Sequence, residues 1–459
     1  MKLKPKIIYD NFSKNVIDKV SAIEQLSTLI ESSNDITIRV KSIEYLNEIE
    51  KINYNSDNKT DKLYHLFENL LISDSNDRIR NLAALFLKRN FLEKVFDPMI
   101  WALHHDSSPD CLIVIFESLM DIIEGVLKKK DDLSKNILLN KIRHINEKEF
   151  KIGFEIWYEK NKEKDVTKKD LAEILINYFC LIYLQKTIWR LKFSIDNCKI
   201  VELDFSFKDL TKLPEPIKYL SSLKKLIIKY SLLTELPDWI GSFLNLESLN
   251  LNVNNIIKLP EPIGYLKSLK ELLLWKNDLE LLPDSIGLLN SLEIMNLRLN
   301  QLILLPSSIG KLSNLKNLNL HDNSLNSIPE SIGSLTSLEV LNLSWNELTC
   351  IPESIGYLSS LKVLDLERNQ LSSVPSSLGN LISLKNLNLN DNKLTEIPYT
   401  IGNLRNLEIL SLSRNKISEL PKNIASLTSL KEIYLGENNL DSIPTDLKLL
   451  EKRGLKIFT

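Results

Sequence analysis

"IPESIGYLSSLKVLDLERNQLSS", residues 351–373, is nearly repeated by the stretch of equal length before it and by the one after it. When Leu361 is taken as position 1, steps of this same length reach Ile or Leu at eleven successive places, from Ile200 to Leu430, without an insertion or deletion. Position 15 is proline in all eleven units, and position 9 is asparagine in nine of them. A period held this strictly predicts similar structural units stacked side by side.

Within each unit, the spacing of apolar residues predicts a short strand. In Val363-Leu364-Asp365-Leu366-Glu367, apolar positions 4 and 6 alternate with the variable and mostly polar positions 3, 5 and 7. A period of two residues is typical of a strand with one buried face. Since such a strand is too short to be stable alone, each is expected to pair in parallel with the strands of neighbouring units.

The other constant positions predict how the chain leaves the strand and returns to it. The Asn at position 9 follows the strand, where its side-chain amide can bond backbone groups of that turn and the next. Proline at position 15 lacks an N–H group and belongs outside the sheet, at the start of a short helical turn. Positions 18, 21 and the next 1, such as Ile355, Leu358 and Leu361, present one apolar side. Glycine at position 19, found in eight units, permits either close packing or a positive φ.

The pattern LxxLxLxxNxL at positions 1–11 resembles leucine-rich repeats, and the continuation LPxxIGxL resembles their Ras-group intracellular type. The resemblance covers residues 200–452, with Lys208 and Ser231 replacing Asn in the first two units. It implies an α/β solenoid, a horseshoe whose parallel sheet lines the concave face. Eleven copies in phase are far more specific than a single motif match.

Short segments on either side are expected to close the solenoid. Residues 187–205 alternate apolar and polar residues around the turn dipeptide Asp196-Asn197, which predicts a capping strand or hairpin at 187–199 that covers the edge of the first unit. At the other end, residues 453–459 form the remnant of a cap. There Lys456 and Phe458 fall where core apolar positions belong, so the phase has slipped.

Residues 1–186 have helical periodicity with almost no glycine or proline, which predicts an all-α domain. The stretch DSNDRIRNLAALFLKRN (74–90) resembles the second helix of a HEAT-type repeat, with an acidic turn followed by Arg80. Residues 32–49 and 106–123 resemble it, although the second of these lacks the arginine and the spacings are irregular. The resemblance implies a HEAT- or armadillo-like helical-repeat domain before the solenoid.

The composition limits the kinds of partner. The chain carries 58 basic and 60 acidic residues, a net charge of −2, and neither half has a strong excess of one sign. Because a nucleic-acid-binding protein usually has a basic domain or stripe, no nucleic-acid partner is expected.

Location is predicted from apolar runs and cysteines. The N-terminus lacks the apolar core of a signal peptide, and the most apolar run, ILINYFCLIYL (174–184), is too short to span a membrane and predicts a buried helix. The four cysteines are far apart without a CxxC pair, which predicts small buried residues in a reducing compartment. We therefore expect a cytoplasmic protein without membrane insertion.

No catalytic or cofactor-binding motif occurs in the sequence. It contains no GxxxxGK[ST] phosphate loop, GxGxxG fingerprint, kinase signature set, GxSxG elbow or HExxH pair. His104 and His105 are adjacent, so on a helix their side chains diverge by about 100° and make poor joint metal ligands. We predict that the protein is not an enzyme and holds no cofactor or metal.

The residues expected to bind a partner are those that project from the sheet. Eleven strands about 4.8 Å apart span an arc on the order of 50 Å, which suits a protein better than a metabolite. Large apolar and basic groups at positions 7 and 8 have the composition of binding hot spots. The predicted protein-binding residues are Trp275, Arg298, Leu299, His321, Trp345, Glu367, Arg368, Phe207 and Tyr230.

Some of these residues could instead serve the fold. Trp275 and Trp345 could lie flat on neighbouring side chains, and Phe207 and Tyr230 could pack on the helical domain. Asn is the commonest residue at position 5, which we interpret as a default for solubility.

These features favour a non-enzymatic scaffold that binds a protein partner through the concave face. Resemblance to the Ras-group repeats implies small-GTPase signalling as a candidate context. The alternative is a regulatory or sensor subunit of an enzyme assembly, with the helical domain docking the effector. A third class, an enzyme within residues 1–185, would require a deep polar pocket with perturbed ionisable groups.

Overall fold

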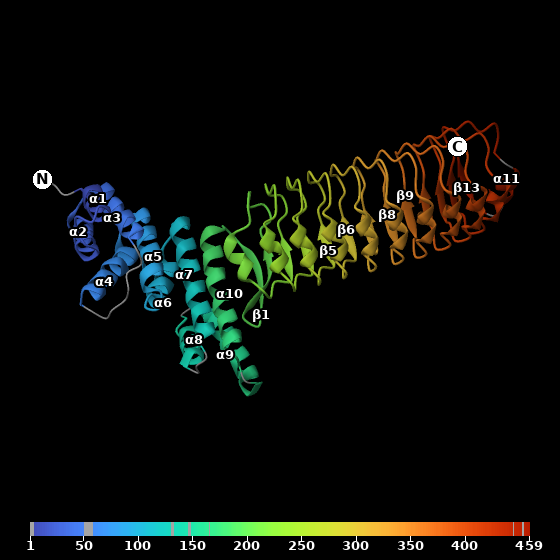
Figure 1. Cartoon of the computed structure of the whole chain (residues 1–459). Helices are drawn as coiled ribbons and strands as arrows, with labels where there is room; N and C mark the ends of the chain where they lie inside the picture. The colour runs from blue at the N-terminus through green and yellow to red at the C-terminus, as the bar shows by residue number, and fades with distance from the viewer. Residues whose placement is uncertain are drawn as a thin grey trace. The chain divides into compact units, whose positions relative to one another are not determined.

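The computed structural model describes residues 4–49, 58–129, 133–145, 148–164, 166–443, 445–451 and 454–459 (Figure 1). The chain divides into two compact units. The first contains the chain up to Leu191 together with residues 195–200, and the second contains residues 192–194 together with the chain from Val201 onward. Pro444 and the expected boundary at 452–453 lie outside the described residues.

The first unit is helical, as its periodicity predicts. Its described helices are α1 (Pro5–Ser13), α2 (Lys19–Ser32), α3 (Ile36–Glu48), α4 (Asn58–Ser73), α5 (Asp77–Phe91), α6 (Phe96–His105), α7 (Pro109–Lys128), α8 (Leu133–Arg143), α9 (Lys148–Asn161), the 3₁₀ helix η1 (Lys162–Lys164) and α10 (Lys168–Thr187). The side chains of Asp18, Asp35 and Asn76 cap α2, α3 and α5 by accepting a first-turn N–H. Among the helices that the structure describes, none has both the length and the apolar character needed to cross a membrane.

Successive helical hairpins are linked through their second helices. Helix α3 packs on α5, α5 on α7, and α7 on α10. Arg39 of α3 pairs with Asp74, in the turn of the next hairpin, and Arg80 of α5 makes two bonds of 2.7 and 3.1 Å to Asp106, in the turn after that. Helix α7 lacks the arginine, and Lys186 of α10 donates a 2.7 Å bond to the backbone oxygen of Asp106, in the turn before α7. The expected array of helical hairpins is thus confirmed, and the acidic turn and arginine link one hairpin to the next.

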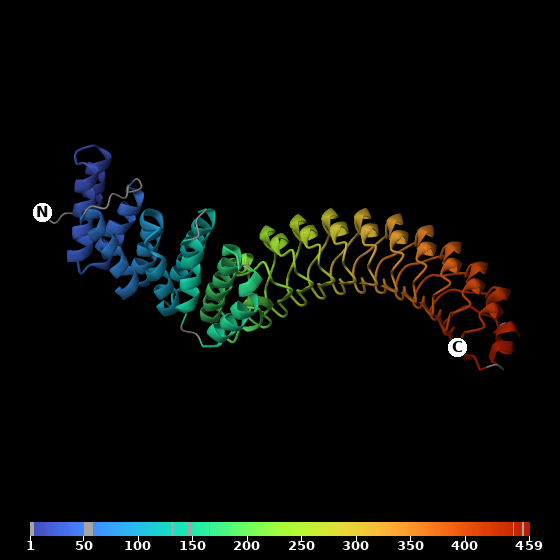
Figure 2. The same cartoon turned by 90° about the horizontal axis from the view of Figure 1, so that it is seen from below.

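The second unit is a solenoid whose strands follow the inner curve (Figure 2). The strands are β1 (Lys192–Asp196), β2 (Lys199–Asp204), β3 (Lys225–Ile227), β4 (Ser248–Asn250), β5 (Glu271–Leu273), β6 (Ile294–Asn296), β7 (Asn317–Asn319), β8 (Val340–Asn342), β9 (Val363–Asp365), β10 (Asn386–Asn388), β11 (Ile409–Ser411), β12 (Glu432–Tyr434) and β13 (Lys456–Phe458). They form one sheet in the order of the sequence. From β2 to β12 neighbouring strands are parallel and offset by one repeat length, as where Leu341 lies opposite Leu364. This register confirms the predicted α/β solenoid.

The two ends of the sheet are closed differently. Strand β1 lies beside β2, and the turn between them uses left-handed backbone at Asn197 and Cys198. At the other end, helix α11 (Thr445–Glu451) precedes β13, which pairs with β12 at an offset longer than one repeat by a single residue. Ile457 therefore lies opposite Ile433, which confirms the phase slip that the sequence indicated: the extra residue places Ile457, and not Lys456, opposite a core position.

A short 3₁₀ helix follows each described proline of position 15 and lies on the outer curve (Figure 2). These helices are η2 (Glu215–Tyr219), η3 (Asp238–Ser242), η4 (Glu261–Tyr265), η5 (Asp284–Leu288), η6 (Ser307–Lys311), η7 (Glu330–Ser334), η8 (Glu353–Tyr357), η9 (Ser376–Asn380), η10 (Tyr399–Asn403) and η11 (Lys422–Ser426). The space between them and the sheet is filled by buried aliphatic residues such as Leu361, Leu364 and Leu366. Cys350 is exposed, so the prediction of burial is wrong for this cysteine, which stands at position 13, outside the rows of core residues.

The Asn at position 9 is buried in eight of its nine units and partly buried at Asn438, and its amide is fully hydrogen-bonded. Asn323 donates bonds of 3.0 Å to the backbone oxygens of Leu320 in its own unit and Leu297 in the preceding unit. Its oxygen accepts a 3.0 Å bond from the N–H of Leu302 in the preceding unit. The same three bonds recur in all nine units that carry this Asn. Each amide therefore bridges two units, as the sequence predicted, but the second unit is the preceding one and not the next.

Glycine at position 19 is required by close packing and not by a positive φ. A Cβ built on Gly333 would lie 2.3 Å from the backbone oxygen of Ser354 in the next 3₁₀ helix. The other seven glycines of this position meet the same kind of oxygen at 2.3 to 2.5 Å. Among the described glycines, a positive φ occurs only at Gly454. The absence of a side chain is thus what lets successive 3₁₀ helices pack so closely.

Gly333→Ala should lower the free energy of unfolding by about 1–3 kcal/mol, because the new methyl group overpacks two backbone segments. Gly125 in α7 is the matched control: no atom lies within 4 Å of an added Cβ there, so Gly125→Ala should stabilise by roughly 0.5–1 kcal/mol. Urea unfolding followed by circular dichroism measures both. Two changes of the same sign would contradict the packing argument.

Candidate functional site

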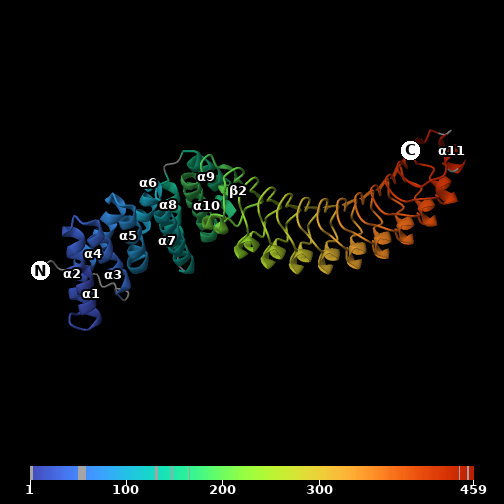
Figure 3. The ribbon, with the colours of Figure 1, turned by 90° about the horizontal axis from the view of Figure 1, so that it is seen from above.

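The candidate site is the face of the sheet that lines the inner curve of the solenoid (Figure 3). In strands β4 to β10 and in β12 the middle residue is buried, whereas its two neighbours are partly exposed on this face. Side chains at positions 3, 5, 7 and 8 of each unit therefore line it.

All eleven residues at position 8 have a left-handed backbone, although none is glycine or asparagine. Their φ values run from 52° at Arg368 to 60° at Phe207 and include 59° at the β-branched Val253. The neighbouring unit helps to hold this conformation: the N–H of Trp345, for example, donates a 2.8 Å bond to the backbone oxygen of Glu367. The conformation costs such residues roughly 1–2 kcal/mol each. The left-handed backbone at position 8 turns the chain so that the Asn of position 9 points inward. The position 8 side chains therefore lie at the ends of the strands.

Asn and Asp at position 5 close a small turn at the end of the strand. The side-chain oxygen of Asn319 accepts a 3.0 Å bond from the N–H of His321, and that of Asp365 accepts one of 3.1 Å from the N–H of Glu367. Five other units have the same bond. The interpretation of these residues as a default for solubility is therefore wrong, because they satisfy an N–H at the point where the strand ends.

Two units without Asn or Asp at position 5 obtain this bond from a neighbour. Leu273 has no side-chain acceptor, and the N–H of Trp275 donates instead to Asn252, at position 7 of the preceding unit, at 2.8 Å. The N–H of Ser413 likewise donates to Asn390 at 2.8 Å. Asn252 and Asn390 are thus structural residues, although they lie on the candidate face.

Aromatic and basic side chains meet near the middle of the face. The rings of His321 and Trp345 meet edge to face with their centroids 6.1 Å apart. The guanidinium of Arg368 lies over the indole of Trp345, 4.0 Å from its centroid. Such a contact combines cation–π attraction with coverage of one face of the ring, yet the side chain of Trp345 remains 44% exposed.

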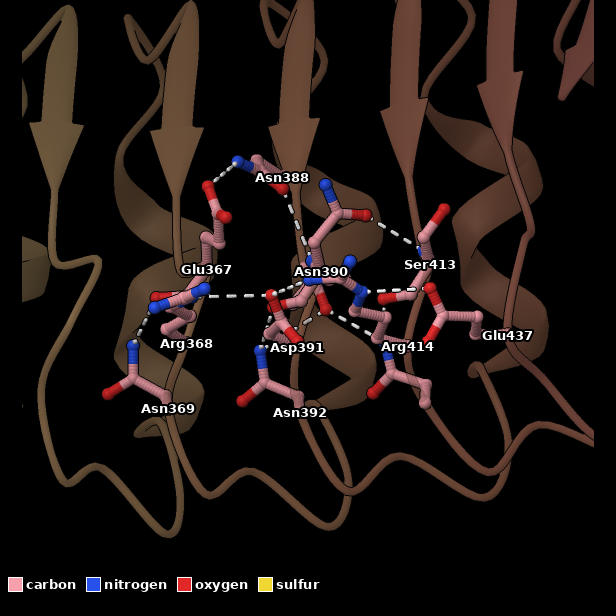
Figure 4. Close-up of polar contacts among 12 residues, drawn as sticks. Glu367, Arg368, Asn369, Asn388, Asn390, Asp391, Asn392, Ser413, Arg414 and Glu437 are labelled. Atoms are coloured by element: carbon pink, nitrogen blue, oxygen red, sulfur yellow. Dashed lines mark hydrogen bonds and ion pairs between the residues drawn. The ribbon is translucent and has the colours of Figure 1, made fainter.

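From Arg368 onward, charges at position 8 alternate in sign (Figure 4). Asp391 lies between two arginines, 3.4 Å from Arg368 and 3.5 Å from Arg414. Arg414 also pairs with Glu437 at 3.0 Å. This part of the face therefore compensates its own charges.

The nine predicted binding residues all stand at positions 7 and 8, in different surroundings. Phe207 and Tyr230 stack on one another with ring centroids 4.6 Å apart and planes inclined by 7°. Leu299 is half-buried. Glu367 accepts a 3.1 Å bond from Asn388, so it is engaged within the solenoid, as Arg368 is (Figure 4).

The sequence predicted that Trp275 projects outward from the sheet. In the structure this side chain is not fully exposed. Its side chain is half-buried, and its indole Nε1 is buried without a hydrogen-bond partner among the described residues. Part of the indole ring is therefore packed against the solenoid and is not available to a partner. An unsatisfied buried N–H costs about 1–3 kcal/mol. A hydrogen-bond acceptor of a partner that reached this N–H would therefore stabilise the complex more than an acceptor bound to a solvated donor.

Arg298 and His321 differ from the compensated arginines. Within the described residues the exposed guanidinium of Arg298 makes no hydrogen bond or ion pair. The ring of His321 is within 2.7 Å of the hydroxyl of Ser344. Burial, and next the charge of Arg298, lower the pKa of His321 from its ordinary value, which favours a neutral imidazole beside a free cation.

Sequence reasoning missed a second regular feature, a ladder of opposite charges at position 2. The signs alternate through seven units, at Lys224, Glu247, Lys270, Glu293, Lys316, Glu339 and Lys362. Three Glu–Lys pairs along it have N–O distances of 2.7 Å. Exposed pairs of this kind contribute at most about 1 kcal/mol each, but they neutralise one margin of the face. The alternation from one unit to the next was visible in the sequence.

In the helical unit, His104 and His105 are exposed at the end of α6. A groove between α6, α8 and α10 contains both, together with His144 and Trp101. The Nδ1 atoms of His105 and His144 lie 2.7 and 2.6 Å from backbone oxygens of their own helices. Across the described residues there is no group of three side chains arranged to hold a metal ion.

Comparison with known proteins supports the repeat pattern. The family profile described as "Leucine-rich repeat region" matches residues 361–453, and that described as "Leucine rich repeat" matches residues 313–371. Among solved structures, a leucine-rich repeat protein of Leptospira interrogans is 31% identical over 55% of this chain and 82% of that chain, with a TM-score of 0.37. No curated protein matches the chain.

Two further solved structures share a similar level of identity. A TDR receptor is 32% identical over 56% of this chain and 46% of that chain, with a TM-score of 0.51. The PEPR1–AtPEP1 structure is 33% identical over 57% and 42%, with a TM-score of 0.47. This chain thus spans less than half the length of either. With the profile matches and the register of the strands, the chain belongs to the leucine-rich repeat proteins.

Asn252→Ala should lower the free energy of unfolding by about 1–2 kcal/mol, because the N–H of Trp275 loses its acceptor. Adding Leu273→Asn supplies an amide at position 5, as in the units with Asn319, and should recover most of the loss. Asn255→Ala, at an exposed position of the same unit, is the control and should change the free energy by less than about 0.5 kcal/mol. Urea unfolding measures all three, and failure of the second substitution to rescue the first would contradict the assignment.

Acidification should destabilise the solenoid through His321. Because folding lowers its pKa, the unfolded chain binds protons more readily, and stability is lost as the pH falls below about 6.5. His321→Gln should therefore reduce the drop in urea midpoint between about pH 7.5 and pH 5. An equal drop in both proteins would mean that other groups carry the pH dependence.

Proposed function

We propose that the protein is a non-enzymatic scaffold that binds a protein partner through the concave face of its repeats. The observation that carries the proposal is the centre of this face, where the free guanidinium of Arg298 lies among exposed or half-buried aromatic rings. Arginine and tryptophan are the residues that dominate binding hot spots. Because the fold does not need these side chains in other units, their presence here favours recognition over stability.

The nine predicted residues divide into a centre and margins. Two groups at the centre can bind a partner without breaking a hydrogen bond or ion pair of the solenoid. The indole N–H of Trp275 and the guanidinium of Arg298 have no partner among the described residues. The proposed centre is Trp275, Arg298, Leu299, His321 and Trp345, and the proposed margins are Phe207, Tyr230, Glu367 and Arg368.

The kind of partner and its location follow from several supports. Leucine-rich repeat proteins generally mediate protein–protein interactions, and one similar structure is a receptor. The resemblance of the repeats to the Ras-group type makes small-GTPase signalling the proposed context. All four cysteines are free thiols, one of them exposed, which supports a reducing cytoplasmic location.

A second candidate function is that of a regulatory or sensor subunit whose helical unit docks the effector. The observation in its favour is the groove between α6, α8 and α10, whose wall includes Trp101 with 41% of its surface exposed. An exposed tryptophan beside a groove is a candidate anchor for a protein partner.

Replacement of Arg298 and Trp345 by alanine tests the first proposal. A partner is first identified by affinity purification with the full chain, and its affinity is then measured by titration of the purified proteins. Arg298→Ala with Trp345→Ala should weaken binding at least tenfold, about 1.4 kcal/mol, while the melting temperature stays nearly unchanged.

The control is Tyr357→Ala with Tyr399→Ala, two exposed aromatic residues of the 3₁₀ helices on the outer curve. These changes should leave the affinity unaltered. A loss of binding only in the control protein would place the partner on the outer curve. A loss only in Trp101→Ala would favour the second candidate function.

A further inference from the structure

Four large aliphatic side chains form an exposed patch on one edge of the solenoid, away from the proposed centre. Ile257, Leu281, Ile303 and Leu304 stand at positions 12 and 13 of the third, fourth and fifth units, and each is between 46% and 53% exposed. We call them the edge patch. They follow the buried residue of position 11, in the segment between the strand and the 3₁₀ helix.

The fold does not require apolar residues at these positions. The eleven units provide an internal comparison, because their backbones correspond position by position in the register of the sheet. The other eight units carry no large aliphatic residue there, and units six to ten have Asn326-Ser327, Thr349-Cys350, Ser372-Ser373, Thr395-Glu396 and Ser418-Glu419. Exposed aliphatic groups lower solubility unless something covers them, so their restriction to three adjacent units points to an interaction surface.

The backbone makes the patch continuous. Between the third and fourth units, the N–H of Asp278 donates to the backbone oxygen of Ile256 at 3.0 Å. Between the fourth and fifth units, the N–H of Ile303 donates to the backbone oxygen of Glu280 at 3.3 Å. The segments that carry the four side chains are therefore hydrogen-bonded neighbours. The four side chains therefore stand on three adjacent segments of the same edge.

The spacing and the charges of the patch indicate what covers it. Neighbouring units are about 4.8 Å apart, close to the roughly 5–6 Å between residues i and i+3 or i+4 on a helix. Three units therefore match about two turns of a helix with one aliphatic stripe. Lys258 and Glu280 stand between the aliphatic residues, both exposed, and among the described residues neither side chain has an ion pair. Lys258 and Glu280 can therefore pair with an acidic and a basic side chain that flank the aliphatic stripe of a bound helix.

We propose that the edge patch is a second docking surface, which binds an amphipathic helix of a protein partner by its aliphatic stripe. A second copy of the chain fits less well, because a stable dimer buries about 800 Å² per subunit, and four half-exposed side chains offer far less. A helix laid in a shallow apolar surface needs only three or four such anchors. This surface is separate from the concave face, so a partner can occupy both.

A selection experiment with a defined probe tests the proposal. The probe is a phage-displayed library of 18-residue helical peptides, selected on the immobilised full chain. The enriched peptides should share aliphatic residues at i, i+3 or i+4, and i+7. Fluorescence anisotropy of one such labelled peptide should show at least tenfold weaker binding to a chain with Leu281→Ser and Leu304→Ser. The melting temperature should stay unchanged, since serine already stands at position 13 in other units, as at Ser327 and Ser373.

A matched control makes the same chemical change elsewhere. Leu244→Ser with Ile382→Ser removes two aliphatic side chains that are more exposed but lie apart, and it should leave the affinity within twofold. The proposal is overturned if no peptide is enriched, if the enriched peptides lack the stripe, or if their binding is insensitive to Leu281→Ser and Leu304→Ser. Binding lost through Arg298→Ala and Trp345→Ala instead would also overturn it, while leaving the concave-face proposal intact.

Analytical ultracentrifugation of the full chain gives a further check. We expect the same sedimentation for the parent chain and for the chain with Leu281→Ser and Leu304→Ser. A dimer that these two substitutions convert to a monomer would show that a second copy covers the patch, which contradicts the proposal of a partner helix.

Discussion

The amide of the Asn at position 9 connects each of nine units to the one before it, and the regular part of the solenoid depends on this bridge. A buried amide is stable only when its donors and acceptor are all bonded. Asn323 meets that condition because the preceding unit presents a carbonyl and an N–H at the required places. One additional residue in the unit would move this carbonyl and this N–H away from the amide. The left-handed residue before the Asn, such as Asp322, accepts a backbone cost so that the amide can reach inward.

The same bridging principle separates structural residues from residues free to bind. On the sheet face, Asn252, Asn390 and the Asx residues of position 5 satisfy backbone N–H groups, so their polarity is explained by the fold. Arg298 has no such role, and neither do the aliphatic residues of the edge patch. Because eleven units share one backbone, a residue that departs from the others without serving a backbone group is a candidate for function.

In the helical unit, successive hairpins are linked by a different kind of contact. Arg39 and Arg80 reach an aspartate in the turn of the next hairpin, which links successive hairpins by charge-assisted bonds. Lys186 of α10 reaches the backbone oxygen of Asp106, in the turn that Arg80 also binds. The acidic turn and arginine near residue 80 were visible in the sequence. The bond from Lys186, at the end of α10, to the turn before α7 was not, since only folding brings these two distant segments together.

The spacing of leucine, asparagine and proline was sufficient to predict the repeat, the parallel register, a short helical turn after the proline and the inward amide, because each depends on contacts that recur at a fixed distance along the chain. The choice at glycine between close packing and positive φ needed the distance from Gly333 to the next unit. The acceptor for the N–H of Trp275, the partial burial of that ring, and the continuity of the edge patch likewise needed coordinates. These properties depend on which side chains meet across neighbouring units, and a linear pattern states the period of such contacts but not their geometry.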